Sequence, residues 1–101
     1  MFLSYQQKTV SNVVPTAADL TIPANATGAI LQAETQNIRY TMDNSTDPTQ
    51  TKGMLLRAAV ATYTADPPQQ FTVEDLLRIR FVRGAGSDAV LNIHYFAGRD
   101  V

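Results

Sequence analysis

Apolar and polar side chains alternate along three runs of this chain, and the alternation predicts β-strands. The runs are residues 37–40 (Asn-Ile-Arg-Tyr), 78–81 (Arg-Ile-Arg-Phe) and 92–95 (Asn-Ile-His-Tyr). Successive side chains of a strand point to opposite faces, so each run has one buried face and one solvated face. Because no segment carries a long apolar stripe with helical spacing, we expect an all-β protein.

Turn-forming residues divide the rest of the chain into short strands about ten residues apart. Residues 74–77 could form one helical turn, although a tight corner is the preferred interpretation, and residues 58–63 could form a strand or a bend. The predicted strands are 20–22, 29–34, 37–42, 54–57, 71–73, 77–82 and 90–96. Seven to eight short strands at this spacing predict an antiparallel β-sandwich, which we expect to be jelly-roll-like.

Residues 84–88 (Gly-Ala-Gly-Ser-Asp) form the clearest predicted turn. A five-residue loop with two glycines is typical of a β-hairpin, so we expect it to join strands 78–82 and 90–96 as antiparallel neighbours. In the second of these strands, Leu91, Ile93 and Tyr95 are predicted to line the buried face. In the strand 37–42, Ile38, Tyr40 and Met42 are predicted to do the same.

The length of 101 residues predicts one domain. Residues 1–14 are expected to form an N-terminal arm or an edge strand, and residues 15–101 a single β-sandwich domain. The polar stretch 43–53 is predicted to be a surface loop. We expect Arg39 to fix the base of this loop by pairing with Asp43 or Asp47.

Composition narrows the classes of partner. Eight basic and nine acidic residues give a net charge of -1, which argues against a dedicated nucleic-acid binder. The apolar runs are far shorter than the ~20 residues of a membrane span. With no cysteine, neither disulfides nor thiolate metal sites can form. We therefore expect neither nucleic acid nor membrane among the partners.

The sequence contains no recognisable pattern of catalytic or metal-ligating residues. The one histidine, His94, lies within a predicted strand on its polar face, and no nucleophile elbow is present. The stretch that begins at Asp43 departs from a calcium loop, because Pro48 and Met54 occupy its sixth and twelfth positions. We expect a protein without catalytic residues, metal or cofactor.

A compact β-module with polar loops and an arm suits contacts with other proteins. Arg39, Arg78, Arg80 and His94 alternate with core residues, so one sheet is expected to present a basic, hydrogen-bonding face. The candidate protein–protein contact residues are Phe2, Tyr5, Arg39, Asp43, Asp47, Arg78, Arg80 and His94.

The stretch from about residue 27 to residue 95 resembles a group of small tailed-phage virion proteins. The segments that carry the resemblance are 26–34, 38–40, Asp43 with 48–49, 53–56, 77–81 and 89–96. It implies a β-sandwich module, associated with capsid or tail, that has no enzymatic activity.

We therefore expect a capsid decoration or cement protein that stabilises the shell by binding the major capsid protein. It would be made in the cytoplasm of the host bacterium, be located in the virion and act as a homotrimer. One alternative is a tail, neck or fibre-attachment component of the virion. Another, from a different class, is a carbohydrate-binding module that helps host adhesion.

Overall fold

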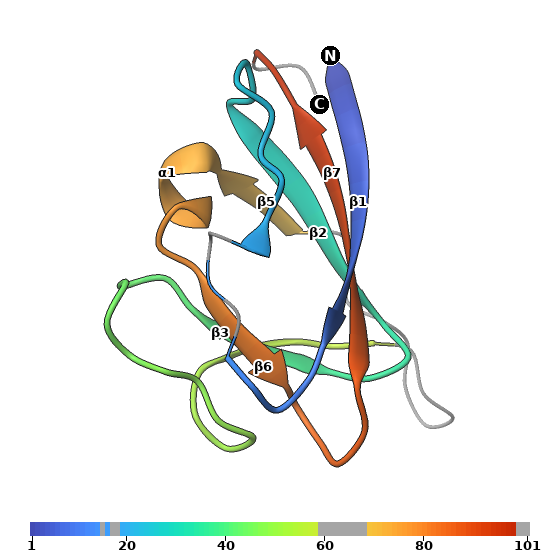
Figure 1. Ribbon diagram of the computed structural model, residues 1–101, viewed down its shortest axis with the longest axis vertical. Helices are drawn as coiled ribbons and strands as arrows, with labels where there is room; N and C mark the ends of the chain where they lie inside the picture. The colour runs from blue at the N-terminus through green and yellow to red at the C-terminus, as the bar shows by residue number, and fades with distance from the viewer. Residues whose placement is uncertain (15, 17–18, 59–68, 99–101) are drawn as a thin grey trace.

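The computed structural model describes residues 1–14, 16, 19–58 and 69–98, which form two antiparallel sheets (Figure 1). The first sheet contains, in order, β1 (Phe2–Val10), β7 (Ala89–Phe96), β2 (Gly28–Glu34) and β5 (Gln69–Thr72). The second contains β4 (Met54–Leu56), β3 (Ile38–Thr41) and β6 (Arg80–Arg83). The predicted all-β sandwich is confirmed.

The strand pairing is that of a jelly roll. β1 pairs with β7, β2 with β5 and β3 with β4. These are the pairs of a single long antiparallel hairpin whose turn is the 42–53 connection between β3 and β4. Thr16 forms an isolated antiparallel bridge with Arg80 of β6, where a further strand of that hairpin would pair. Wrapping the hairpin brings β7 beside β2 and β6 beside β3. In the part of the chain that the structure describes, this bridge stands at the position of the jelly-roll strand that the seven named strands do not supply.

The core lies between the two sheets and is built from the inward faces of their strands. Leu91, Ile93 and Tyr95 are at most 1% exposed, which confirms the predicted buried face of β7. Ile38 is also buried, and Tyr40 and Met42 pack against the core cluster, as predicted for the strand 37–42.

Tyr95 brings a polar group into this core. Its hydroxyl donates to Gln6 Oε1 at 2.8 Å, and the same oxygen accepts from the backbone N–H of Thr21 at 2.9 Å. Burial raises the pKa of Tyr95 to about 12. The Gln6 side chain therefore links β1 both to the core and to the segment that follows it.

The predicted hairpin at residues 84–88 is wrong. β6 pairs with β3, whereas β7 pairs with β1 and β2, so the connection crosses from the second sheet to the first. The N–H of Gly84 donates to the carbonyl of Asn37 at 2.6 Å, and a Cβ on Gly84 would lie only 2.9 Å from that oxygen. An ion pair of 2.7 Å between Arg83 and Asp88 spans the crossing.

Two predicted strands also differ from the structure. Residues 20–22 form no strand, because the N–H of Thr21 bonds to the Gln6 side chain instead of a neighbouring backbone. The strand expected over 77–82 begins only at Arg80, since α1 (Val73–Leu76) and a turn precede it. Thr72 caps α1 by accepting from the N–H of Asp75 at 3.2 Å. Most of the segment 58–63 lies outside the described residues.

The N-terminal segment lies within the first sheet as its edge strand. β1 runs antiparallel along β7 (Figure 1). In this pairing Val10 lies opposite Ala89 and Phe2 opposite Phe96. Val10 is fully buried in the core. Residues 2–10 are therefore an integral part of the sandwich.

Candidate functional site

The outer face of the first sheet brings aromatic rings of β1 and β7 together. Phe2 stacks on His94 with ring centroids 4.4 Å apart, and Tyr5 meets His94 edge-on at 6.2 Å. Phe2 also contacts Phe96 edge-on at 6.4 Å. Four rings therefore form a continuous group across two neighbouring strands.

A bulge in β1 makes this arrangement possible. In a regular strand, residues three apart point to opposite faces, so Phe2 and Tyr5 would lie on different sides of the sheet. The register between β1 and β7 shifts between Phe2 and Tyr5, which adds one residue to β1. Both rings consequently reach the same outer face.

Side-chain amides continue the ring group along the sheet. Asn92 Oδ1 accepts from the Tyr5 hydroxyl at 2.5 Å and from Gln7 Nε2 at 3.1 Å, while Asn92 Nδ2 donates to Glu34 at 3.4 Å. A hollow of about 300 Å³ lies at this surface. The outward residues that line it, which we name the aromatic face, are Phe2, Tyr5, Ile30, Gln32, Asn92 and His94.

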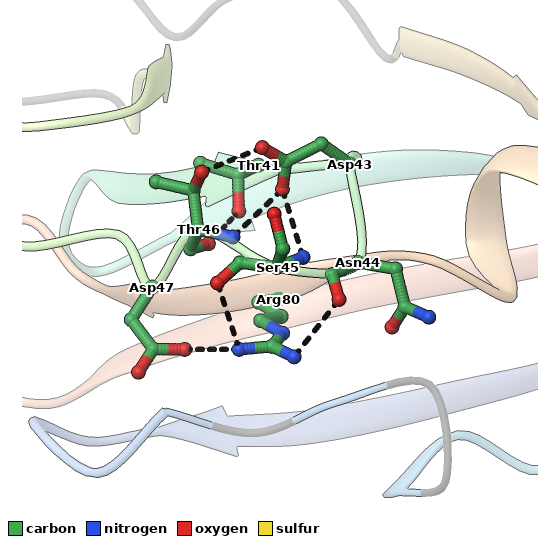
Figure 2. Close-up of polar contacts among 7 residues, drawn as sticks. All are labelled: Thr41, Asp43, Asn44, Ser45, Thr46, Asp47 and Arg80. Atoms are coloured by element: carbon green, nitrogen blue, oxygen red, sulfur yellow. Dashed lines mark hydrogen bonds and ion pairs between the residues drawn. The ribbon is translucent and has the colours of Figure 1, made fainter.

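A second cluster fixes the loop that follows β3. The guanidinium of Arg80 donates from Nη1 to Asp47 at 2.6 Å and from Nη2 to the carbonyl of Asn44 at 3.0 Å (Figure 2). Nη1 also lies 3.4 Å from the carbonyl of Ser45. One arginine of β6 thus holds three residues of the loop, Asn44, Ser45 and Asp47.

Arg39 holds the other end of the same loop. Its Nη1 donates to the carbonyl of Gly53 at 2.9 Å, so the predicted pairing of Arg39 with Asp43 or Asp47 is wrong. The register explains the difference, because Arg80 lies opposite Thr41 at the start of the loop, whereas Arg39 lies opposite Leu55 at its end.

Asp43 organises the loop locally. Its carboxylate accepts from the hydroxyl of Thr46 at 2.5 Å and from the backbone N–H groups of Thr46 and Ser45 at 2.8 and 3.0 Å (Figure 2). These hydrogen bonds, the one from the Thr46 hydroxyl first, hold the pKa of Asp43 well below its usual range. Asp43, Asp47 and Arg80 therefore order a loop.

The predicted contact residues divide between these two places. Phe2, Tyr5 and His94 meet on the first sheet, while Asp43, Asp47 and Arg80 meet at the loop. The expected basic face is not formed, because Arg39 and Arg80 belong to the second sheet and His94 to the first. Arg78 lies apart from both groups, exposed in the turn after α1.

Sequence reasoning missed several surface residues. Met54 and Leu55 of the edge strand β4 are 62% and 38% exposed, and Ile30, Gln32 and Asn92 complete the aromatic face. For two of these residues, the sequence pattern did contain a sign of an exposed apolar position. Ile30 and Leu55 are apolar residues at outward positions, each beside a buried neighbour in its strand.

Within the described ranges, no group of three or more metal-ligating side chains could hold a metal ion. No helix in that part of the chain is long and apolar enough to cross a membrane. Comparison with protein-family models, with curated proteins and with solved structures found no match to this chain.

Proposed function

We propose that the protein is a non-enzymatic structural component of a tailed-phage particle and decorates the capsid by binding the major capsid protein. The observation that carries the proposal is the jelly-roll pairing of the strands, since this architecture occurs in viral capsid and lectin domains. The resemblance of residues 27–95 to small virion proteins supports the same class. Because one fold hosts many functions, particle binding is the direct test.

The contact with the shell is assigned to the edge of the second sheet. Met54 and Leu55 expose apolar surface there. Among the described residues β4 is an edge strand of its sheet, and edge strands can offer backbone groups to a partner. An open hollow of about 570 Å³ lies beside β4, lined in part by Met42, Lys52 and Met54. Methionine side chains adapt readily to a partner's shape.

The loop beside this edge strengthens the assignment. Arg80 and Arg39 hold the start and the end of the 43–53 segment, and Pro48 within it is fully buried. A loop fixed in this way loses little conformational freedom when a partner binds. The second-sheet edge therefore presents a preorganised surface.

The first test is the copy number of the protein in purified particles, measured by quantitative mass spectrometry. A copy number on the order of hundreds per particle supports decoration of the shell. A copy number of about six or twelve supports the tail or neck alternative. Absence from purified particles overturns the proposal. Light scattering on the isolated protein tests the proposed homotrimer.

The second test maps the contact. The double variant Met54→Ser with Leu55→Ser is expected to lower occupancy on particles at least about tenfold, because it removes the apolar contact. Leu77→Ser is the matched control, since Leu77 is 58% exposed but lies after α1. Equal occupancy of the double variant and the unmodified protein would rule out the second-sheet edge as the contact surface.

A further inference from the structure

We infer that the aromatic face is a binding site for neutral carbohydrate, and that it takes the pyranose rings of a glycan. It lies on the first sheet, whereas the shell contact is assigned to the second. The inference is therefore independent of the proposed particle role. It gives the chain a recognition activity in addition to a structural one.

The exposed rings supply surfaces for stacking. Phe2 is 43% exposed and Tyr5 is 57% exposed, so each presents aromatic surface to solvent. The C–H groups on one side of a pyranose ring pack against such surfaces, as other apolar groups do. Both rings are already held, Phe2 by stacking on His94 and Tyr5 by its bond to Asn92. Little side-chain freedom would be lost on binding.

Polar groups with hydrogen-bonding capacity border the rings. The Gln32 amide makes no side-chain hydrogen bond with any described residue, although it lines the hollow. Asn92 Nδ2 donates one N–H to Glu34, and its second N–H makes no hydrogen bond with a described residue. Side-chain amides offer a donor and an acceptor together, which matches the neighbouring hydroxyl groups of a sugar.

The charge and size of the hollow argue against other ligand classes. Among the described residues, no lysine or arginine lines it, so a phosphate backbone or an anionic lipid headgroup would find neither of these cations there. The volume of about 300 Å³ is at the lower end of the range for small-molecule sites, about 300–1,000 Å³.

The test uses the full chain on an array of neutral and anionic oligosaccharides, followed by calorimetric titration with the neutral oligosaccharides that bind. We expect binding to at least one neutral glycan and none that requires sulfate or carboxylate groups. An array with no bound glycan overturns the inference. Binding restricted to anionic glycans overturns it as well.

Variants connect binding to the face. Tyr5→Ala is expected to weaken neutral-glycan binding about tenfold, and Gln32→Ala to weaken it several-fold. The matched control is Thr9→Ala, because Thr9 is an exposed residue of β1 outside the hollow. Thermal melting checks that each variant folds. Equal binding by Tyr5→Ala and Thr9→Ala contradicts the inference.

The same variants separate this inference from the proposed function. Binding of glycan by a protein that is absent from particles refutes the structural role and leaves the glycan site. Loss of particle occupancy in Tyr5→Ala, with no glycan bound by the unmodified protein, means that the face contacts a protein and overturns the inference. The Met54→Ser with Leu55→Ser double variant is expected to keep full glycan binding.

Discussion

Arg80 shows how a single side chain orders a loop more through backbone contacts than through charge. Its ion pair with Asp47 is largely solvated, since the Asp47 side chain is 64% exposed, and such surface pairs contribute about 0–1 kcal/mol. The same guanidinium also binds the carbonyls of Asn44 and Ser45. Those groups would otherwise need water as their partner.

Asp43 makes the order of this loop depend on pH. Its folded pKa lies below the unfolded value of about 3.9, so its stabilising effect is present above that value and is lost as pH falls through the folded pKa. Asp43→Asn keeps an acceptor oxygen but removes the charge. We expect its denaturation midpoint to lie below that of the unmodified protein at pH 7, with the difference shrinking toward pH 2.

Urea denaturation at several pH values measures this effect. Asp19→Asn is a suitable control, because Asp19 is an exposed carboxylate outside the 43–53 loop. A difference between Asp43→Asn and the unmodified protein that stays constant with pH would show that the charge of Asp43 does not stabilise the loop.

At the scale of elements, the start of β2 depends on close packing. Gly28 lies opposite Phe96 on one side and Thr72 on the other, at the point where β7 and β5 flank β2. A Cβ on Gly28 would lie 2.4 Å from the carbonyl oxygen of Phe71 and 2.6 Å from the ring of Phe96. Because one of these atoms belongs to the backbone, the clash cannot be relieved by a rotamer change alone.

Gly28→Ala is therefore expected to destabilise the fold by about 1–3 kcal/mol, the usual range for overpacking. Gly86→Ala is the matched control, since a Cβ there would meet nothing within 4 Å. Chemical denaturation of both variants gives the comparison. Similar stability of Gly28→Ala and Gly86→Ala would show that β5 and β7 can move apart at this point without cost.

At the scale of the whole molecule, the jelly roll closes by pairing the two ends of the described chain. The N-terminal ammonium of Met1 donates to the carbonyl of Ala97 at 3.0 Å, and the N–H of Ala97 donates to the carbonyl of Met1 at 2.8 Å. β1 also contributes Val10 to the core and Gln6 as the partner of Tyr95. Its loss would expose β7 as a new edge of the first sheet.

Deletion of residues 1–11 is accordingly expected to abolish cooperative unfolding, because it removes a strand, a core residue and the cover of β7. Circular dichroism during heating, with NMR dispersion as a second measurement, checks the outcome. A truncated chain that still unfolds in one sharp transition would show that residues 1–11 behave as a dispensable arm.

Alternation along the chain is enough to predict most of the strands and their buried faces, because it is a local property of the backbone. Leu91, Ile93 and Tyr95 are buried as that period requires. The same alternation predicted that Asn92 and His94 lie on the solvated face. The same pattern predicted that most elements are strands and that the fold is all-β.

The pairing of the strands depends on tertiary contacts that the sequence pattern does not show. Alternation is the same whether a strand joins one sheet or the other, so it could not show that residues 84–88 cross between sheets. Nor could it show the bulge that brings Phe2 and Tyr5 to one face, or the register that gives Asp47 to Arg80 and not to Arg39. These are long-range choices, made by backbone hydrogen bonds between segments far apart in the chain.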